Sequence, residues 1–341
     1  MDVNTAIKVP KLSVIIITRN EERNISRCID AVLRAIRYIE STEVILVDSC
    51  STDRTIEIAS KYPIKIIQLQ PSSKLSAGAG YYIGFKHSLG ELVHFQCGDS
   101  LLDENWFKNA IPVLDQDSSV GGVAGIISQE PHGTLMAKDY ANRLSNLPNG
   151  EAKWFMIDTF FKRSALLKAG SFNPHLRSTE EGELCYRIRD KGFKLVRLPI
   201  HMSHHLGCRE NALSYLTKSL SYAVGYGQVL RYATGSRRIF HWRLNDFKFY
   251  FASLFLTAIF FIGFALLISL GFPMLVYIWI ACSIFLLLWF TLERKDFLKA
   301  VMFAILIAVT TPSFLWGLLK PKKDPNTFPD SELVLKSSPY N

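Results

Sequence analysis

The stretch that decides the fold is Gly90-Glu91-Leu92-Val93-His94-Phe95-Gln96-Cys97-Gly98-Asp99-Ser100. Its apolar part, Leu92–Phe95, predicts a short buried strand that stops at a small, acidic end. Gly98 lets the backbone turn there, because it carries no side chain that would clash. Asp99 then follows the carboxyl end of the strand, where open α/β sheets bind ligands. An aspartate in that place either holds a divalent cation or bonds to its own backbone in a turn.

Two strand ends upstream also carry polar residues. The β-branched run Leu12–Ile17 predicts a strand buried on both faces of a parallel sheet. A second run, Glu43–Val47, predicts another such strand, and a helix is expected between the two. This order favours a nucleotide-binding α/β fold with right-handed crossovers. The carboxyl ends of these strands are therefore expected to gather Thr18, Glu21, Asp48, Asp53 and Asp99 at one edge of the sheet.

Three of these stretches resemble the motifs of the family 2 glycosyltransferases, which have the GT-A fold. Val14–Glu22 is similar to "VIIPTYNEE", Ile45–Thr55 to "IIVDDGSTDGT", and Gly90–Ser100 to "GEYIAFLDADD". The resemblance extends from about Leu12 to Gly235. It implies an inverting hexosyltransferase that uses a nucleotide-diphosphate sugar as donor and Mg²⁺ or Mn²⁺ as cofactor.

The resemblance also implies the roles of individual residues. The nucleotide sugar would bind Thr18, Glu21, Asp48, Asp53 and Asp99. Asp99 would also hold the metal, together with His205, and His204 is the second choice for that ligand. The family motif is Asp-x-Asp, but Cys97 stands at its first position, and a soft thiol is a poor ligand for a hard cation. Helix capping is the alternative role for Glu21 and Asp53.

A fourth stretch, Ser178–Phe193, resembles the family's "EDxDLxxRLxxxGF". The second acid of that motif is the catalytic base, and here it is Glu181. Inversion requires a carboxylate that takes the proton of the attacking acceptor hydroxyl. The alternative for Glu181 is an acidic helix N-terminus that interacts favourably with the helix dipole.

Residues 228–232 resemble the QxxRW motif of membrane-bound, chain-extending members, with tyrosine in place of tryptophan, and equally the "RYGRG" ending of members that add a single sugar. Gln228, Arg231 and Tyr232 would bind the diphosphate or the acceptor sugar through charge and stacking. A basic amphipathic helix over 213–232, lying at a membrane interface, is compatible with that role.

The composition excludes several classes of protein. The chain has 341 residues, a net charge of +9 and six scattered cysteines without a CxxC pair. No disulfide framework or zinc site is therefore expected, and a reducing compartment fits. No basic run is interleaved with aromatic residues, so nucleic acid is not an expected partner.

The sequence after residue 249 predicts membrane helices over 249–272, 273–292 and 300–319, since each run approaches the length of a bilayer span. Basic residues before the first run place that side in the cytosol. We expect a multi-pass protein of the plasma (inner) membrane, with its catalytic domain facing the cytosol and a lipid-linked, polyprenyl-type acceptor. The expected domains are a tail (1–11), a GT-A domain (12–235), a basic linker (236–248), the transmembrane helices (249–319) and a polar tail (320–341).

The predicted fold is thus α/β of the GT-A type, with a mostly parallel sheet followed by C-terminal transmembrane helices. The predicted role is sugar transfer in polysaccharide or glycolipid biosynthesis. One alternative is a catalytically inactive membrane scaffold of a polysaccharide assembly, which the missing acid at Cys97 would favour. Another is a processive polysaccharide synthase, although two or three spans leave little room for a polymer channel.

Overall fold

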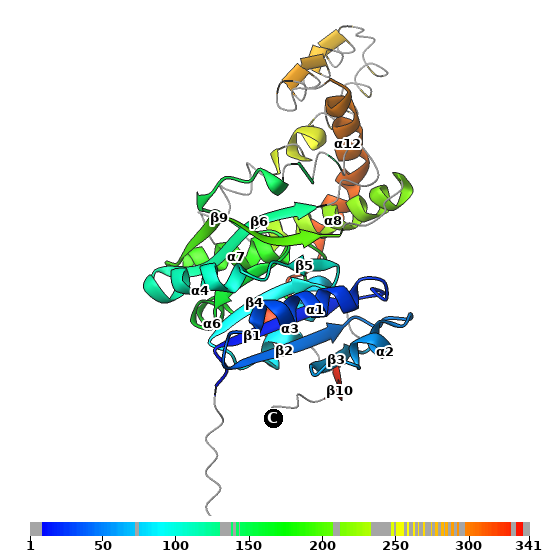
Figure 1. Cartoon of the computed structure of the whole chain (residues 1–341). Helices are drawn as coiled ribbons and strands as arrows, with labels where there is room; N and C mark the ends of the chain where they lie inside the picture. Colours follow the sequence, from blue (N-terminus) through cyan, green and yellow to red (C-terminus); the bar gives the residue numbers. More distant parts are fainter. Residues whose placement is uncertain are drawn as a thin grey trace, which may run out of the picture. The chain divides into compact units, whose positions relative to one another are not determined.

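The computed structural model divides the chain into two compact units (Figure 1). Unit 1 comprises Met1–His132, Ala137–Arg209 and Lys323–Asn341, and unit 2 comprises Gly133–Met136 and Glu210–Lys322. The described residues are 9–71, 75–129, 138, 141–142, 144–206, 212–232, 247–248, 250–255, 297–328 and 332–336, with single residues between 258 and 292.

Unit 1 is built on a ten-stranded sheet, whose first half is parallel. This half contains β3 (Lys65–Leu69), β2 (Thr42–Asp48), β1 (Leu12–Thr18) and β4 (Leu92–Cys97), in that spatial order. The register pairs Thr18 with Asp48 and Ile17 with Cys97. The three strands β2, β1 and β4 therefore end at the same edge, as the sequence predicts.

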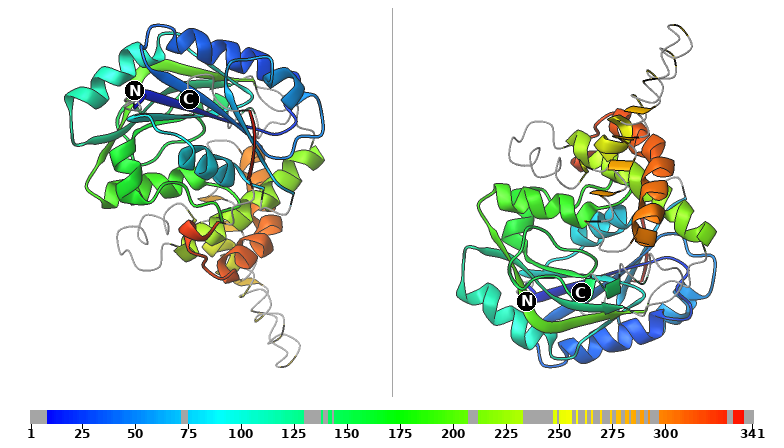
Figure 2. Two further views of the ribbon diagram at one scale, coloured as in Figure 1. Left: turned by 90° about the horizontal axis from the view of Figure 1, so that it is seen from below. Right: turned by 90° about the horizontal axis from the view of Figure 1, so that it is seen from above.

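Helices cover both faces of this half-sheet (Figure 2). They are α1 (Ile25–Ile36), α2 (Thr55–Ala59), α3 (Ala77–Lys86) and α4 (Trp106–Gln116). The helix expected between the first two strands is α1, and its apolar face, including Cys28 and Val32, is buried. On the opposite face of the sheet, α3 packs very closely, because a Cβ at Gly84 would lie 2.2 Å from Cγ2 of Ile15.

The second half of the sheet is mixed, so the prediction of a mostly parallel sheet is wrong. β8 (Thr159–Lys162) runs antiparallel to both β4 and β6 (Val120–Gln129). β9 (Lys194–His205) is parallel to β6 but antiparallel to β5 (Ser100–Leu102) and β7 (Gly150–Glu151). Burial on both faces is typical of parallel strands, but β8 is buried in the same way and is antiparallel to both of its neighbours.

Two apolar runs form strands of unexpected length. The run Lys153–Phe161 is irregular up to Asp158, because Ile157 has a φ of +54° and turns the backbone. The strand that begins at Lys194 continues past Pro199 to His205. The register with β6 shifts near Pro199, and this irregularity accommodates a residue that has no N–H to donate.

A strand distant in sequence completes the sheet beyond β3. β10 (Glu332–Lys336) pairs antiparallel with β3, after the short 3₁₀ helix η1 (Pro325–Thr327). Between them, the buried ring of Phe328 lies 6.0 Å from the rings of both Tyr82 and His175. The segment treated in the sequence analysis as a polar tail thus contributes a strand and an aromatic contact to unit 1.

Unit 2 contains the paired helices α8 (Ala212–Tyr232) and α12 (Phe297–Leu319). They approach closely at glycines, since a Cβ at Gly317 would lie 2.0 Å from the carbonyl oxygen of Val224. A small buried cluster stabilises the pair, and in it Phe314 stacks on Tyr250 at 4.6 Å.

The prediction of C-terminal transmembrane helices is wrong. In the part of the chain that the structure describes, no helix combines the length and the apolar character needed to cross a bilayer. The run 300–319 lies in α12, where the hydroxyls of Thr310 and Thr311 are buried and hydrogen-bonded within unit 2. Most of 249–272 and 273–292, and nearly all of the linker 236–248, lie outside the described residues. The multi-pass location in the plasma membrane depended on these spans and is likewise wrong.

Candidate active site

The end of β1 places a polar group beside the Gly98 turn. Thr18 is buried, and its hydroxyl has no hydrogen-bond partner among the described residues. A Cβ at Gly98 would lie 3.0 Å from that hydroxyl oxygen, so no larger residue fits there without a shift. Thr18 therefore presents an unused donor at the predicted ligand-binding edge.

At the end of β2, Asp48 is fully buried and shapes its own loop. Its carboxylate accepts hydrogen bonds from the N–H and the hydroxyl of Ser51 and, at 2.9 Å, from the side-chain amide of Gln68. Because a carboxylate offers about four acceptor sites, these donors leave Asp48 little capacity for a ligand.

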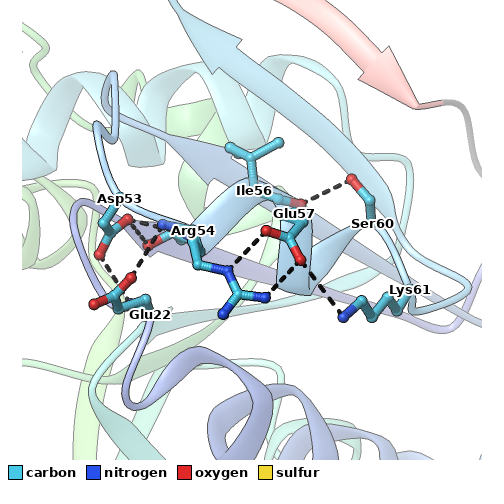
Figure 3. A network of polar contacts seen from close by, with 8 residues as sticks. Glu22, Asp53, Arg54, Ile56, Glu57, Ser60 and Lys61 are labelled. Carbon is cyan, nitrogen blue, oxygen red and sulfur yellow. Dashed lines mark hydrogen bonds and ion pairs between the residues drawn. The ribbon is translucent and has the colours of Figure 1, made fainter.

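The loops after β1 and β2 are linked to each other (Figure 3). Asp53 accepts hydrogen bonds from the N–H groups of Glu22 (3.1 Å) and Thr55 (3.0 Å), and the Glu22 carboxylate accepts one from the N–H of Arg54 (3.2 Å). Although burial acts to raise the pKa of Asp53, the hydrogen bonds from Thr55 and Glu22 lower it overall. Asp53 therefore joins the start of α2 to the loop after β1 and fixes the position of Glu22.

Farther along α2, a network of exposed charges holds the short helix together (Figure 3). The guanidinium of Arg54 donates two hydrogen bonds of 2.8 Å to Glu57, and Lys61 lies 3.8 Å from the same carboxylate. The bonds from Arg54 lower the pKa of Glu57 to about 2. All three side chains are solvent-exposed, so the network belongs to the surface and not to the site.

Glu21 lies near the predicted metal-binding residues. Its carboxylate accepts a hydrogen bond of 2.8 Å from the side chain of Asn24. Burial raises the pKa of Glu21, and the nearby charges of Asp99 and Asp53 add to the increase, whereas Asn24 and His205 oppose it. Glu21, Asp99 and His205 therefore form one electrostatic group.

Asp99 and His205 meet as the sequence analysis expects. Oδ1 of Asp99 lies 3.2 Å from Nε2 of His205, and only 15% of each side chain is exposed. The pairing of β5 with β9 brings them together, because Ser100 lies opposite His205. Among the described residues, no group of three or more His, Cys, Asp or Glu side chains could hold a metal. Two protein donors are therefore present at this point.

The other two histidines of β9 have different neighbours. His201 and His204 both contact the hydroxyl of Ser128, at 2.9 and 2.8 Å, and His201 lies 3.6 Å from Asp103. Since successive residues of a strand point to opposite faces, His204 cannot replace His205 beside Asp99 without a change in the strand.

One buried acid near this turn, Asp158, is not among the predicted site residues. It accepts hydrogen bonds from the N–H of Cys97, at 2.9 Å, and from the hydroxyl of Ser100. Burial, followed by the charges of Asp158 and Asp99, raises the pKa of Cys97 well above its ordinary value, so this cysteine remains a neutral thiol. The available signal was an acid within the apolar run 154–161, since buried carboxylates are rare unless they are partnered.

Glu181 lies in the first turn of α7 (Glu180–Asp190), which follows α6 (Arg163–Ala169). Burial raises the pKa of Glu181 well above its ordinary value, and the charges of Glu180 and Asp158 add to the increase. Hydrogen bonds from backbone N–H groups, including that of Glu181 in the first turn of α7, act in the opposite direction, as a helix N-terminus would. Both Glu181 and Asp99 also raise the pKa of Cys97, which indicates that the predicted base and the predicted metal ligand share that neighbour.

The remaining predicted residues belong to α8 of unit 2. Gln228 is buried, Arg231 is exposed and Tyr232 is intermediate in exposure. The predicted nucleotide, metal and base residues all belong to unit 1.

A parallel half-sheet that continues into a mixed half, with acids at its carboxyl edge, is the arrangement of a GT-A-like fold. The family described as Glycosyl transferase family 2 matches residues 13–175. The chain therefore contains a family 2 glycosyltransferase domain and is a transferase enzyme, which confirms the family expected from the motifs.

Named relatives are glycosyltransferases. Over 240 residues the chain is 22% identical to the dolichyl N-acetyl-alpha-D-glucosaminyl phosphate 3-beta-D-2,3-diacetamido-2,3-dideoxy-beta-D-glucuronosyltransferase of Methanococcus voltae, covering 64% of this chain and 74% of the relative. It is 28% identical over 179 residues to the poly(ribitol-phosphate) beta-N-acetylglucosaminyltransferase TarS of Staphylococcus aureus, covering 50% of this chain but 31% of that relative.

A solved structure has the same fold. The mannosyltransferase PcManGT of Pyrobaculum calidifontis, in complex with GDP-Man and Mn²⁺, matches with a TM-score of 0.59 and 17% identity, covering 90% of this chain and 87% of that one. This likeness establishes the GT-A-like fold of the chain.

Proposed function

We propose that this transferase moves a sugar, with inversion, from a nucleotide-diphosphate sugar to a hydroxyl of a lipid-linked acceptor. The observation that carries the proposal is the placement of two acids: Glu181 lies in the first turn of α7, where burial raises the pKa of its carboxyl, and Asp99 lies 3.2 Å from His205 after β4. The PcManGT complex with GDP-Man and the dolichyl-linked substrate in the name of the archaeal relative support the donor and acceptor classes.

In this proposal Glu181 is the general base. It removes the proton of the acceptor hydroxyl while that oxygen attacks the anomeric carbon from the side opposite the leaving diphosphate. A carboxylate whose surroundings disfavour its anion binds that proton more strongly than an ordinary glutamate.

Asp99 and His205 are the proposed ligands of a divalent cation, Mg²⁺ or Mn²⁺. Their donor atoms are 3.2 Å apart, so one cation could contact both the carboxylate oxygen and the imidazole nitrogen. The donor set fits, and diphosphate oxygens and water would complete it. When bound, the cation offsets the charge of the departing nucleoside diphosphate.

Of the residues predicted to bind the nucleotide, some are proposed to contact it directly and others to fix the loops around it. Thr18 provides its unused hydroxyl, and Glu21 lies beside Asp99. Asp48 and Asp53 act mainly by fixing the loops that surround the nucleotide, because their oxygens already accept hydrogen bonds. The acceptor or diphosphate is assigned to Gln228, Arg231 and Tyr232.

The test is a transfer assay with the full chain. Purified protein is incubated with a panel of UDP-, GDP- and dTDP-sugars and short polyprenyl-linked acceptor sugars, with Mn²⁺, with Mg²⁺ or with EDTA. We expect one donor to give a lipid-linked product whose anomeric configuration, read by NMR, is inverted. Retention of configuration, or the absence of donor binding and consumption across the panel, would contradict the proposal.

A further inference from the structure

Asp158 is a buried carboxylate whose hydrogen bonds have no role in the mechanism proposed above, although its charge adds to the raised pKa of Glu181. It has no exposed surface and lies directly before β8, after the backbone turn at Ile157. Burying a carboxylate is costly unless its oxygens accept hydrogen bonds. Here Oδ1 accepts the N–H of Cys97, at 2.9 Å, and Oδ2 accepts the hydroxyl of Ser100.

These two donors flank the residues that carry the predicted metal ligand. Cys97 is the last residue of β4 and Ser100 is the first of β5, and Gly98 and Asp99 lie between them. The ladder between β4 and β8 ends at the pair Phe95 and Thr159. Beyond that pair, the side chain of Asp158 accepts the N–H of Cys97 in place of a backbone carbonyl of β8. Because it also accepts the hydroxyl of Ser100, it holds both ends of the turn 97–100.

The other side of the turn is fixed by β1. The N–H of Gly98 donates to the carbonyl of Ile17 at 2.9 Å, and a Cβ at Gly98 would lie 3.0 Å from that oxygen. The turn therefore lies between the end of β1 and the Asp158 carboxylate, with little room to shift while both contacts remain.

The position of this turn determines where Asp99 lies. The Asp99 carboxylate is 3.2 Å from His205, and its carbonyl accepts the N–H of Leu206 at 2.9 Å. We propose that Asp158 is a positioning residue for sugar transfer, which acts by holding the turn 97–100 so that Asp99 faces His205. The proposal depends on the function proposed above for the role of Asp99 in the reaction, but not for the contact that holds the turn.

Three substitutions separate positioning from other roles of a buried acid. Asp158→Ala removes both contacts. Asp158→Asn keeps both, because its oxygen can accept the Cys97 N–H while its amide donates to the Ser100 hydroxyl. Ser100→Ala removes one contact with a smaller change to the core. The matched control is Thr159→Val, since Thr159 is adjacent and equally buried, and its hydroxyl has no partner among the described residues.

The first measurement is hydrogen exchange of the full-length protein, which requires no activity. If the Asp158 contacts hold the turn, peptides covering 96–101 should exchange about 10-fold faster in Asp158→Ala and also faster in Ser100→Ala, while β1 peptides stay protected. Asp158→Asn and Thr159→Val should resemble the wild type. Unchanged exchange at 96–101 in both Asp158→Ala and Ser100→Ala overturns the proposal, whatever the protein transfers.

The second measurement is the transfer rate with the donor found in the panel assay. A displacement of about 1 Å can reduce a rate on the order of 100-fold, so Asp158→Ala should lose that much in kcat/KM, and Asp158→Asn should recover most of it. Equal losses in the Asn and Ala variants, or wild-type kinetics in Asp158→Ala, overturn positioning by these hydrogen bonds. A wild-type protein that uses no donor contradicts the proposed function, and the exchange result then decides the contact separately.

Discussion

Glu181 and Glu183 lie in the same turn of α7, but their surroundings differ. The Glu183 carboxylate accepts two hydrogen bonds from Arg187, and the same guanidinium binds the carbonyls of Ala169 and Ser171. Glu181 lies near Glu180 and Asp158, which disfavour its anion. Glu183 therefore stabilises the fold, whereas ionised Glu181 decreases the free energy of unfolding.

Replacing Glu181 by glutamine should separate activity from stability. We expect Glu181→Gln to lower kcat by about 1,000-fold, within the range for loss of a general base, while the Kd for UDP or GDP stays close to that of the wild type. The variant should also be more stable by about 0.5–2 kcal/mol at neutral pH, as for a strained site residue. Kinetics, calorimetry and thermal melting check these effects.

The matched control is Glu183→Gln, which breaks the buried ion pair with Arg187. It should lower stability and should affect kcat less than Glu181→Gln does. A Glu181→Gln enzyme with normal turnover would remove Glu181 as the base.

The pH dependence of transfer follows from the raised pKa of Glu181. The base is active when deprotonated, so kcat/KM should rise with pH until that pKa is passed. This acidic limb should therefore lie at a higher pH than for an ordinary glutamate. Because the folded pKa is raised, protonated Glu181 favours the folded state at low pH, and this stability is lost as the pH rises through the raised pKa.

Substitution of the neighbouring residue Glu180 tests what raises the pKa of Glu181. The charge of Glu180 raises the pKa of Glu181, so Glu180→Gln should move the acidic limb to lower pH. A limb that stays in place would show that burial alone sets this pKa. The measurement is kcat/KM between pH 4 and 9 for both proteins.

The residues of the site differed in how far the sequence could predict them. Glu181, Asp99 and His205 follow strand ends or motifs, and the structure brings the last two together. Hydrogen bonds within loops cannot be read from spacing, so the internal partners of Asp48 and Asp53 were not predicted. Asp158 was missed because its partners lie about 60 positions away in the sequence.

At the scale of elements, the turn between β4 and β5 depends on glycine. In Gly98→Ala the new Cβ would lie 3.0 Å from the carbonyl of Ile17, a backbone atom that cannot move aside. We expect kcat/KM to fall on the order of 10–100-fold through displacement of Asp99, with a smaller effect on melting temperature. Gly182→Ala is the control, because nothing lies within 4 Å of its Cβ and alanine favours the helix by about 0.5–1 kcal/mol. Unchanged kinetics in Gly98→Ala would contradict this account of the turn.

The segment from η1 to β10 should contribute measurably to the free energy of unfolding of unit 1. Phe328 is buried beside Tyr82 and His175, and the carbonyl of Asp324 lies 3.1 Å from Nε2 of His175. Phe328→Ala should destabilise unit 1 by about 3 kcal/mol, as for other buried phenylalanines. Denaturant unfolding measures the change, and the exposed Leu335→Ala serves as control. Equal effects of the two substitutions would argue against a docked segment.

The helices and strands that have a clear pattern of apolar residues were predicted well. The strands whose direction and place depend on distant contacts were not. The runs of β1 and β2 match their predicted ranges closely, and α1 lies between them as expected. The direction of β8 and the place of β10 depend on which strand each one meets, and no local pattern encodes that.

At the scale of the whole molecule, hydropathy misled the prediction of membrane helices. An apolar run has the same hydropathy whether lipid or another helix covers it, and length alone does not decide between the two. In α12, one face is buried in unit 2, with Phe314 against Tyr250 and Thr311 bonded to Ser253.

A single methyl group added between α8 and α12 should therefore destabilise the packing of the two helices. Gly317→Ala places a methyl group 2.0 Å from the carbonyl of Val224, and such overpacking typically costs about 1–3 kcal/mol. Calorimetry should show a lower transition for unit 2, while nucleotide binding by unit 1 persists. Unchanged melting would contradict the close approach of the two helices.

The pairing of β3 with β10 has a consequence for biosynthesis. Leu69 pairs with Glu332, so 263 positions of sequence separate two neighbours in one sheet. At about 5–20 residues per second of translation, the outer edge of β3 waits roughly 10–50 seconds for its partner. During that interval the nascent chain presents an unpaired strand edge, which invites association with other chains. Slow synthesis downstream of β3 should therefore increase the demand for chaperones.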